Sequence, residues 1–105
     1  MVSQKNLYCP VARSANVIGD RWTLLILRDL FQNGRCRFQS LLESLDGIAP
    51  NTLSARLKSL EANGIIERDF YEMHPPRAEY LLTEKGRALG PIIRALYKWG
   101  DQYGT

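Results

Sequence analysis

The segment from Ala49 to Leu82 constrains the fold of this chain more than any other part of the sequence. Its second residue is Pro50, and proline is common at the first position of a helix. The apolar residues that follow recur at the helical spacing i, i+4 and i+7, and they are Leu53, Leu57 and Leu60. Asn63 and Gly64 then predict the end of the helix. The pattern predicts one amphipathic helix with its leucines turned toward a core.

A β-hairpin is predicted directly after this helix. Residues 65–72, with the sequence IIERDFYE, alternate imperfectly between apolar and polar side chains, as a half-buried strand does. Residues 73–77 form a tip, because two consecutive prolines stiffen it and cannot donate ladder hydrogen bonds. On the returning strand, Ala78, Tyr80 and Leu82 share one face. We therefore expect two antiparallel strands joined by a rigid tip.

A short helix is predicted before this segment, over residues 37–45. Its apolar stripe consists of Phe38, Leu41, Leu42 and Leu45, and Asp46-Gly47 forms a tight turn after it. The order helix, turn, helix and two-stranded hairpin is that of a winged helix-turn-helix, which offers its second helix to the major groove of DNA. The sequence therefore predicts an α+β, mostly helical fold, with the helix-turn-helix at about 37–63 and the wing at about 65–82.

Further helices are predicted on both sides of this unit. Cys9-Pro10 opens a helix that ends at Gly19, and Asp20 can cap the next helix, which is apolar nearly all the way round and should be central. Asn33-Gly34 is expected to end this second helix. Thr83 can cap a long last helix over about 83–103, which Pro91 could bend or break. No linker or repeat separates these elements, so we expect residues 1–105 to form one domain.

The composition describes a globular chain, with 45% apolar and 24% charged residues. No apolar run is long enough to span a membrane, and the first ten residues lack the apolar core of a signal peptide. We therefore expect a cytoplasmic protein with no membrane partner. The net charge is +3, but residues 1–40 carry six bases and two acids while the remainder carries eight bases and nine acids. Affinity for DNA phosphates must therefore come from a few individually positioned basic residues rather than from a continuous stretch of basic residues.

The helix after Pro50 presents short polar side chains and two cations on its outer face. Such a surface suits DNA, because short groups come close to base edges and arginine or lysine binds guanine edges or phosphate oxygens. The residues expected to approach bases are Asn51, Thr52, Ser54 and Arg56. The residues expected to position the DNA backbone are Lys58, Arg37, Gln39 and Arg77, with His74 at the hairpin tip as a further candidate.

Each of these candidates has a plainer alternative. An ordinary solvated helix face would carry the same polar residues, and a histidine at a hairpin tip is most often only solvated. Arg77 could instead pair with Glu79 or another acid. Ala49 is a poor N-cap, so it leaves N–H groups free, either as a small stability cost or as a site for a phosphate oxygen.

The two cysteines raise the question of thiol chemistry. Cys9 stands at a predicted helix start, where the helix dipole can stabilise a thiolate; the alternative is a small apolar residue packed under the first helix. Cys36 lies between Arg35 and Arg37, which could also favour a thiolate, although a spectator thiol is the simpler interpretation. No C-x-x-C and no Cys/His pair at metal spacing is present, so we expect no metal site and no cofactor.

The terminal helices carry more apolar surface than a core of this size requires. A helix can use such a stripe to cover its own domain, but the surplus here favours a partner, most simply a second copy of the chain. A two-fold dimer would place its two recognition helices about 34 Å apart and would bind an inverted repeat. The residues expected at the dimer interface are Val11, Leu89, Ile92, Ile93, Leu96, Tyr97, Trp99 and Tyr103.

Several motifs together resemble one protein family. They are CP near the N-terminus, IGDRWTLLILRDL, RCRFQSL, GIAPNTLSARLKSLEANGII and PPRAEYLLTEKGRAL. From Cys9 to about Gly100 the chain resembles the HxlR-type transcriptional regulators, which are related to MarR-type regulators. The resemblance implies a bacterial or archaeal, dimeric, winged-helix DNA-binding protein whose terminal helices build the dimer. It also implies that Cys9 could sense electrophiles, quinones, aldehydes or oxidants, as the cysteine before the proline does in several members. Cys36 has no obvious counterpart there.

The leading hypothesis is therefore a homodimeric transcription regulator that binds double-stranded DNA, with a small electrophile or oxidant as a candidate partner that modifies Cys9. The alternative is a winged-helix module that binds another protein and no DNA. A thiol enzyme is disfavoured, because the single histidine lies in the predicted wing and neither cysteine has an evident base beside it.

Overall fold

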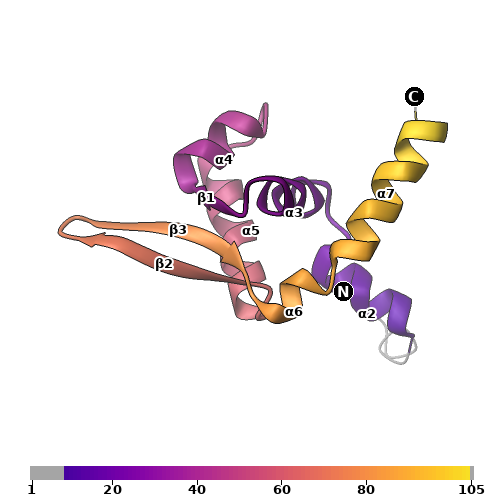
Figure 1. Ribbon diagram of the computed structural model, residues 1–105, viewed down its shortest axis with the longest axis horizontal. Coiled ribbons are helices and arrows are strands. Elements are labelled where there is room, and N and C mark those ends of the chain that lie inside the picture. Colours follow the sequence, from indigo (N-terminus) through magenta and orange to yellow (C-terminus); the bar gives the residue numbers. More distant parts are fainter. Residues whose placement is uncertain (1–8, 105) are drawn as a thin grey trace.

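The computed structural model describes residues 9–104, and its elements follow the predicted order (Figure 1). In chain order they are α2 (Pro10–Ile18), α3 (Arg21–Asn33), β1 (Arg35–Arg37), α4 (Phe38–Ser44), α5 (Pro50–Ala62), β2 (Ile66–Met73), β3 (Pro76–Leu82), α6 (Glu84–Arg87) and α7 (Gly90–Tyr103). The absence of a signal peptide was predicted from the first ten residues. Most of these lie outside the described range, so the absence stays a prediction. None of the described helices is long and apolar enough to cross a membrane.

The predicted helix boundaries are confirmed where a local signal marks them. The side chain of Asp20 caps α3 by accepting a hydrogen bond from the backbone N–H of Thr23 at 3.0 Å. Gly34 ends α3 with a φ of 79°, in the left-handed region that favours glycine. The Thr83 hydroxyl caps α6 by accepting from the backbone N–H of Gly86 at 3.1 Å. These caps depend on neighbouring residues alone, which is why the sequence reveals them.

The core gathers around α3, which crosses the middle of the molecule (Figure 1). Its Ile26, Leu27 and Leu30 are fully buried. The predicted leucine face of α5 is confirmed, since Leu53, Leu57 and Leu60 are at most 1% exposed. The remaining buried apolar residues are Ile18, Cys36, Leu41, Leu45, Ile48, Ile65, Ile66 and Leu82. This core holds α4 and α5 in a fixed relation to each other and to the base of the wing.

The sheet has three antiparallel strands in the order β1-β3-β2, and β1 was not predicted. The pairing places Arg35 opposite Leu81 and Cys36 opposite Tyr80. A strand of three residues is too short to show an alternating pattern, and its pairing with β3 is a contact between distant parts of the chain. Arg37 accordingly ends β1 and is the N-cap of α4 rather than a residue within that helix.

The prediction that β2 is half-buried is wrong beyond its first residue. Ile66 is buried, whereas every residue from Glu67 to Met73 is exposed. Figure 1 shows the reason, because the hairpin of β2 and β3 projects away from the helices and no other element covers its outer half. Its apolar residues Phe70, Tyr71 and Met73 therefore face solvent. The wing is a projecting arm rather than a layer of the core.

The last helix that was predicted over 83–103 is broken near Pro91, which is one of the two outcomes expected for that proline. The structure has two helices, α6 and α7, separated at Ala88 and Leu89. Pro91 lies in the first turn of α7. In a continuous helix Pro91 could not donate a hydrogen bond to the carbonyl of Arg87, and its ring would clash with that carbonyl. The proline therefore starts a new helix and does not bend an existing one.

Candidate nucleic-acid interface

The helix-turn-helix presents the first two turns of α5 on the surface, while its leucines pack inward. Asn51 is exposed, and Thr52 and Ser54 are partly exposed on the same stretch of helix. Lys58 is exposed one turn further along. No side chain caps the N-terminus of α5, because its N-cap is Ala49. Free N–H groups and short polar side chains therefore occur together at this end of the helix.

Arg56 has a partner inside the molecule that the sequence did not suggest. Its Nε donates a hydrogen bond of 2.9 Å to Oδ2 of Asp20, the residue that caps α3. The same oxygen accepts hydrogen bonds from the backbone and the hydroxyl of Thr23. Partial burial acts to raise the pKa of the Asp20 carboxyl, but the hydrogen bonds from Thr23 and Arg56 outweigh it and hold the pKa below its ordinary value. Arg56 therefore ties the recognition helix to the start of α3.

This lowered pKa makes an acid-stability prediction. Because the Asp20 carboxyl is more acidic in the folded than in the unfolded chain, its stabilising effect is complete above the unfolded pKa, near 3.8, and is lost as the pH falls through the folded value. The variant Asp20→Asn keeps an N-cap. We expect its free energy of unfolding to be slightly lower than that of the native protein at pH 7 and equal to it at low pH. Urea unfolding at pH 7, 4 and 2.5 measures the difference. A difference that grows below pH 4 would contradict the prediction.

The other predicted backbone contacts gather beside the wing. Arg37, Gln39 and Arg77 line one groove between the start of α4 and the hairpin, together with Tyr71. The guanidinium of Arg37 lies 4.4 Å from the centre of the Tyr71 ring, with the carboxylate of Glu79 at 4.0 Å. This groove also contains Arg68, which the sequence interpretation overlooked. Arg37 at the end of β1 thus lines the same groove as Arg68 and Arg77 of the wing.

The two candidates at the wing tip are placed differently. Arg77 forms an ion pair of 3.2 Å with Glu72 on the opposite strand, which matches the alternative that an acid of the hairpin holds it. His74 lies exposed in the turn between β2 and β3. Arg35 pairs with Asp69 at 2.6 Å, and Arg68 pairs with Glu61 at 3.1 Å. These ion pairs are exposed and exchange easily, so the arginines can turn to a phosphate.

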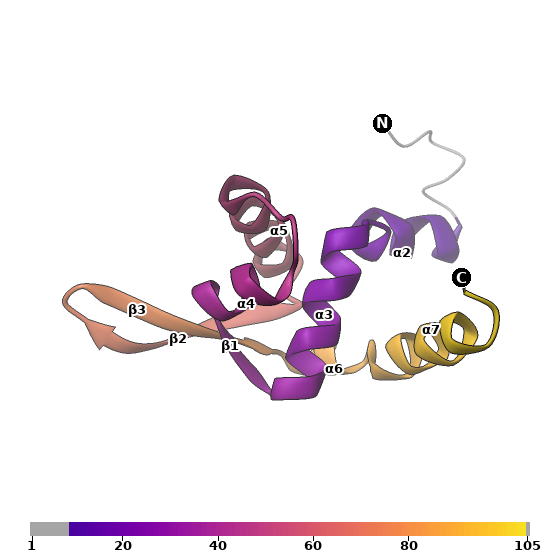
Figure 2. The ribbon, with the colours of Figure 1, turned by 90° about the horizontal axis from the view of Figure 1, so that it is seen from above.

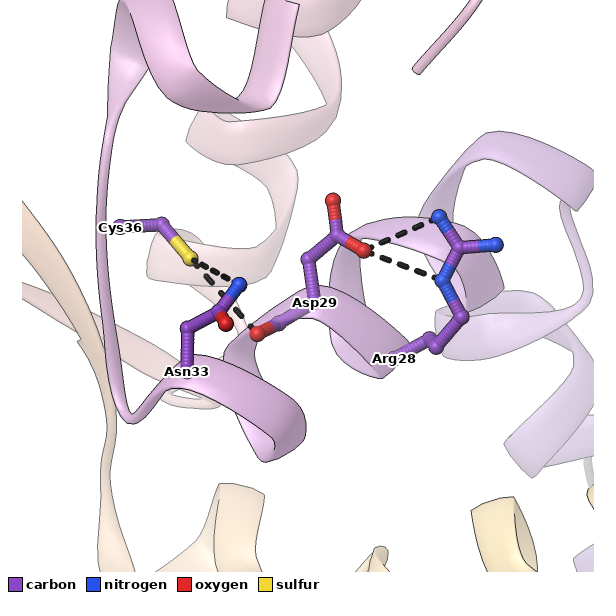
Figure 3. A network of polar contacts seen from close by, with 4 residues as sticks. All are labelled: Arg28, Asp29, Asn33 and Cys36. Carbon is purple, nitrogen blue, oxygen red and sulfur yellow. Dashed lines mark hydrogen bonds and ion pairs between the residues drawn. The ribbon is translucent and has the colours of Figure 1, made fainter. Parts of the chain in front are cut away.

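The two cysteines lie in opposite environments. Cys36 is 5% exposed, and its thiol lies 3.7 Å from the backbone oxygen of Asp29 and 3.9 Å from the side-chain amide of Asn33 (Figure 3). Burial raises the pKa of the Cys36 thiol. Strand alternation turns the neighbouring arginines outward, so they do not stabilise a thiolate. Cys9, in contrast, is exposed at the N-cap of α2.

These environments predict the order in which the thiols react. Cys9 should react with a thiol-specific disulfide reagent within seconds to minutes, while Cys36 should react only as the protein unfolds. Counting the thiols released in native buffer and in urea tests this, with Cys9→Ser as the control for assignment. Rapid reaction of both thiols in the native protein would contradict the buried position of Cys36.

The terminal helices α2 and α7 lie at the end of the molecule opposite the wing (Figure 2), and they expose several large apolar side chains. Tyr97 is 71% exposed and Trp99 is 63% exposed. The other exposed members of the predicted interface are Val11, Ile92, Leu96 and Tyr103. Leu89 and Ile93 behave differently, because they are partly buried against the core of their own chain. Only the exposed residues therefore contribute to the apolar surface that was expected to bind a second copy of the chain.

The comparisons with known proteins agree with this geometry. A model of the HxlR-like helix-turn-helix family matches residues 17–105. An HTH-type transcriptional regulator of Synechocystis sp. is 41% identical over 95 residues, covering 90% of this chain and 70% of that protein.

Solved structures agree as well. The redox regulator HypR in its reduced form superimposes with a TM-score of 0.83 at 35% identity, covering 89% of this chain and 91% of that one. The reduced form of the regulator YodB from Bacillus subtilis gives a TM-score of 0.74 at 38% identity, covering 90% of this chain and 93% of that one. The chain therefore belongs to the HxlR-like helix-turn-helix family of transcriptional regulators.

Proposed function

We propose that this regulator binds double-stranded DNA as a homodimer and recognises an inverted-repeat operator. The observation that carries the proposal is the placement of the uncapped, polar N-terminal turns of α5 on the same unit as the arginine-lined groove of the wing. A major groove accepts a helix of this kind, and the adjacent phosphates accept the arginines. Such a protein acts in the cytoplasm, where the DNA of a bacterial or archaeal cell lies.

The residues of this surface fall into two groups, those that can reach base edges and those that can reach phosphates. Asn51, Thr52 and Ser54 approach the base edges, because they are short and lie in the first turns of α5. Lys58, Arg37, Gln39 and Arg77 contact phosphates, and His74 lies at the tip where a minor groove would pass. Arg56 both approaches the DNA and holds α5 against α3 through Asp20.

The dimer in this proposal forms through α2 and α7. Their exposed apolar residues lie at the end opposite the wing, so a two-fold axis there leaves both recognition surfaces free (Figure 2). Half of these exposed residues are aromatic, a residue type that is enriched at protein interfaces. A dimer of this kind reads two half-sites about one DNA turn apart.

Selection of bound sequences from a random DNA pool tests the proposal directly. We expect an enriched inverted repeat whose half-sites are separated by about one helical turn, and a binding constant that falls steeply with salt. Sedimentation at equilibrium should give the mass of a dimer. Absence of binding at low salt would favour the alternative, a module that binds another protein through α7.

We further propose that modification of Cys9 switches DNA binding. The support is the exposure of Cys9 at the start of a helix that would belong to the dimer, together with the description of HypR as a redox regulator. With a quinone, the thiolate sulfur bonds to a ring carbon, and proton transfer yields a sulfur-substituted hydroquinone without loss of atoms. The added group at α2 would shift the two subunits, and a small shift suffices because both recognition helices must fit one operator.

Replacing Cys9 by serine should remove the response to the modifying reagent. We expect native protein treated with benzoquinone to lose most of its operator affinity, whereas Cys9→Ser binds the operator normally and does not respond. Fluorescence anisotropy with labelled operator measures the affinity, and mass spectrometry counts the adduct. Cys36→Ala is the matched control and should keep the response. A full response of Cys9→Ser to benzoquinone would contradict the proposed switch at Cys9. It would not contradict the proposal that the protein binds DNA.

A further inference from the structure

One residue of the wing interrupts the pairing of its two strands. Phe70 lies opposite Ala78 and Glu72 lies opposite Arg77, so Tyr71 between them has no partner on β3. An extra residue of this kind is a β-bulge, which re-aims a side chain and is common beside functional sites. The Tyr71 side chain is 40% exposed, so packing in a core does not explain its position.

The ring of Tyr71 lies against the guanidinium of Arg37. Because β3 lies between β1 and β2 in the sheet, Arg37 of β1 reaches Tyr71 of β2 across the central strand. The guanidinium carbon is 4.4 Å from the ring centre, within the distance of about 6 Å over which an aromatic face attracts a cation. The Glu79 carboxylate is 4.0 Å from Nε of Arg37, which is too long for a hydrogen bond. The ring, rather than a hydrogen bond to this acid, therefore positions the guanidinium.

The other arginines around the wing are engaged differently. Arg35, Arg68 and Arg77 form ion pairs of 2.6, 3.1 and 3.2 Å with Asp69, Glu61 and Glu72. Each of these must release a carboxylate before it contacts a phosphate. A ring contact uses the flat face of a guanidinium and leaves the N–H donors in its plane free for an anion. In this group, Arg37 is therefore the arginine whose donors are most available.

The contact also joins the two parts of the proposed DNA surface. Arg37 is the N-cap of α4 in the helix-turn-helix, whereas Tyr71 belongs to β2 of the wing. Both residues line the groove that contains Gln39 and Arg77, two of the expected contacts to the DNA backbone. A guanidinium that is held in place before DNA arrives loses less side-chain freedom when a phosphate binds.

We propose that Tyr71 is a positioning residue for DNA binding. Its ring holds the face of the Arg37 guanidinium so that the N–H edge meets a phosphate of the DNA backbone, and the bulge places the ring where Arg37 crosses the sheet. Tyr71 acts through Arg37 and reads no base itself. This inference rests on the proposed function, because the phosphate belongs to the DNA that α5 recognises.

Fluorescence anisotropy with the duplex enriched from the random pool tests this role. Tyr71→Leu should weaken binding by about fivefold, the upper range for a cation–π contact at an exposed site. Tyr71→Phe keeps the ring and should bind within about twofold of the native protein. Met73→Leu is the matched control, because it introduces the same side chain on the same strand at a residue that is 61% exposed. It should change the affinity by less than about twofold.

A double-mutant cycle distinguishes positioning from a direct or a structural role. Arg37→Ala should weaken binding by about tenfold and reduce the salt slope by about 0.9, the value for one lost phosphate contact. In the Arg37→Ala protein, Tyr71→Leu should cause less than about twofold further loss, because the residue through which Tyr71 acts is already absent.

The outcomes separate this inference from the proposed function. A ring that contacts DNA directly, or that only stabilises the hairpin, would cost about fivefold with or without Arg37, and that result would overturn the positioning role. Equal losses in Tyr71→Phe and Tyr71→Leu would overturn it as well. Native binding that Tyr71→Leu leaves unchanged would overturn this inference alone. A native protein that binds no duplex at low salt would overturn the proposed function, and this inference with it.

Discussion

Replacing Gly86 by alanine is expected to destabilise the folded chain by about 3 kcal/mol or more, the upper range for overpacking a buried site. Gly86 is buried in α6, and a Cβ there would lie 2.1 Å from the backbone oxygen of Ile65. That oxygen is held in place, because it accepts a hydrogen bond from the backbone N–H of Thr83 at 3.0 Å. The added methyl must therefore separate α6 from the base of the wing.

Gly100→Ala is the matched control for this substitution. Gly100 lies within α7, and a Cβ there would meet nothing within 4 Å. Alanine in a helix is favoured over glycine by about 0.5–1 kcal/mol, so this variant should be slightly more stable than the native chain. Urea unfolding followed by circular dichroism compares the three proteins. Equal stability of Gly86→Ala and the native chain would mean that α6 does not pack against Ile65 as described.

Arg56→Ala is expected to weaken operator binding by about tenfold to a hundredfold, equivalent to roughly 1.4–2.7 kcal/mol, with a native circular-dichroism spectrum. Two contributions add in this variant. On the proposed function, the side chain approaches the DNA on the outer face of α5, and its ion pair of 2.9 Å with Asp20 orients α5 against α3. The circular-dichroism spectrum should remain native because an ion pair this exposed contributes little to stability.

Asp20→Asn separates these two contributions. Asparagine caps a helix as well as aspartate does, so α3 keeps its N-cap while Arg56 loses its charged partner. Direct DNA contact by Arg56 predicts that Asp20→Asn keeps most of the operator affinity, because the freed guanidinium still reaches the DNA. We expect this outcome, with a loss of at most about threefold from poorer positioning, or roughly 0.7 kcal/mol. Equal losses in Asp20→Asn and Arg56→Ala would make Arg56 a positioning residue only.

The parts of the fold that were predicted correctly depend on neighbouring residues. The leucine face of α5, the caps at Asp20 and Thr83, and the glycine at the end of α3 all follow from spacings of four residues or fewer. The break at Pro91 was expected as one of two outcomes, and the steric conflict with the preceding turn decided it. Sequence periodicity failed for β2, because an alternating pattern shows two faces but not whether anything covers either of them.

The candidate DNA surface was predicted as a set of residues, but not as a set of contacts. Asp20 and Arg56 are 36 positions apart, and no local pattern links a helix cap to the middle of a later helix. The same holds for Arg37, whose position over Tyr71 depends on the pairing of β1 with β3. Composition could show that the recognition segment is nearly neutral. It could not show which cations are engaged by acids and which remain available.

The sequence by itself determined the order of the main helices and the wing, the helix ends that a cap or a glycine marks, and the leucine face of α5, because these are set by interactions between residues close along the chain. The tertiary structure alone decided which cysteine is buried, where the wing projects, which acid holds each arginine, and that Arg37 of β1 lies over Tyr71 of β2. The physical reason is that burial and ion pairing depend on which distant segments approach one another, and that approach is settled only when the whole core packs.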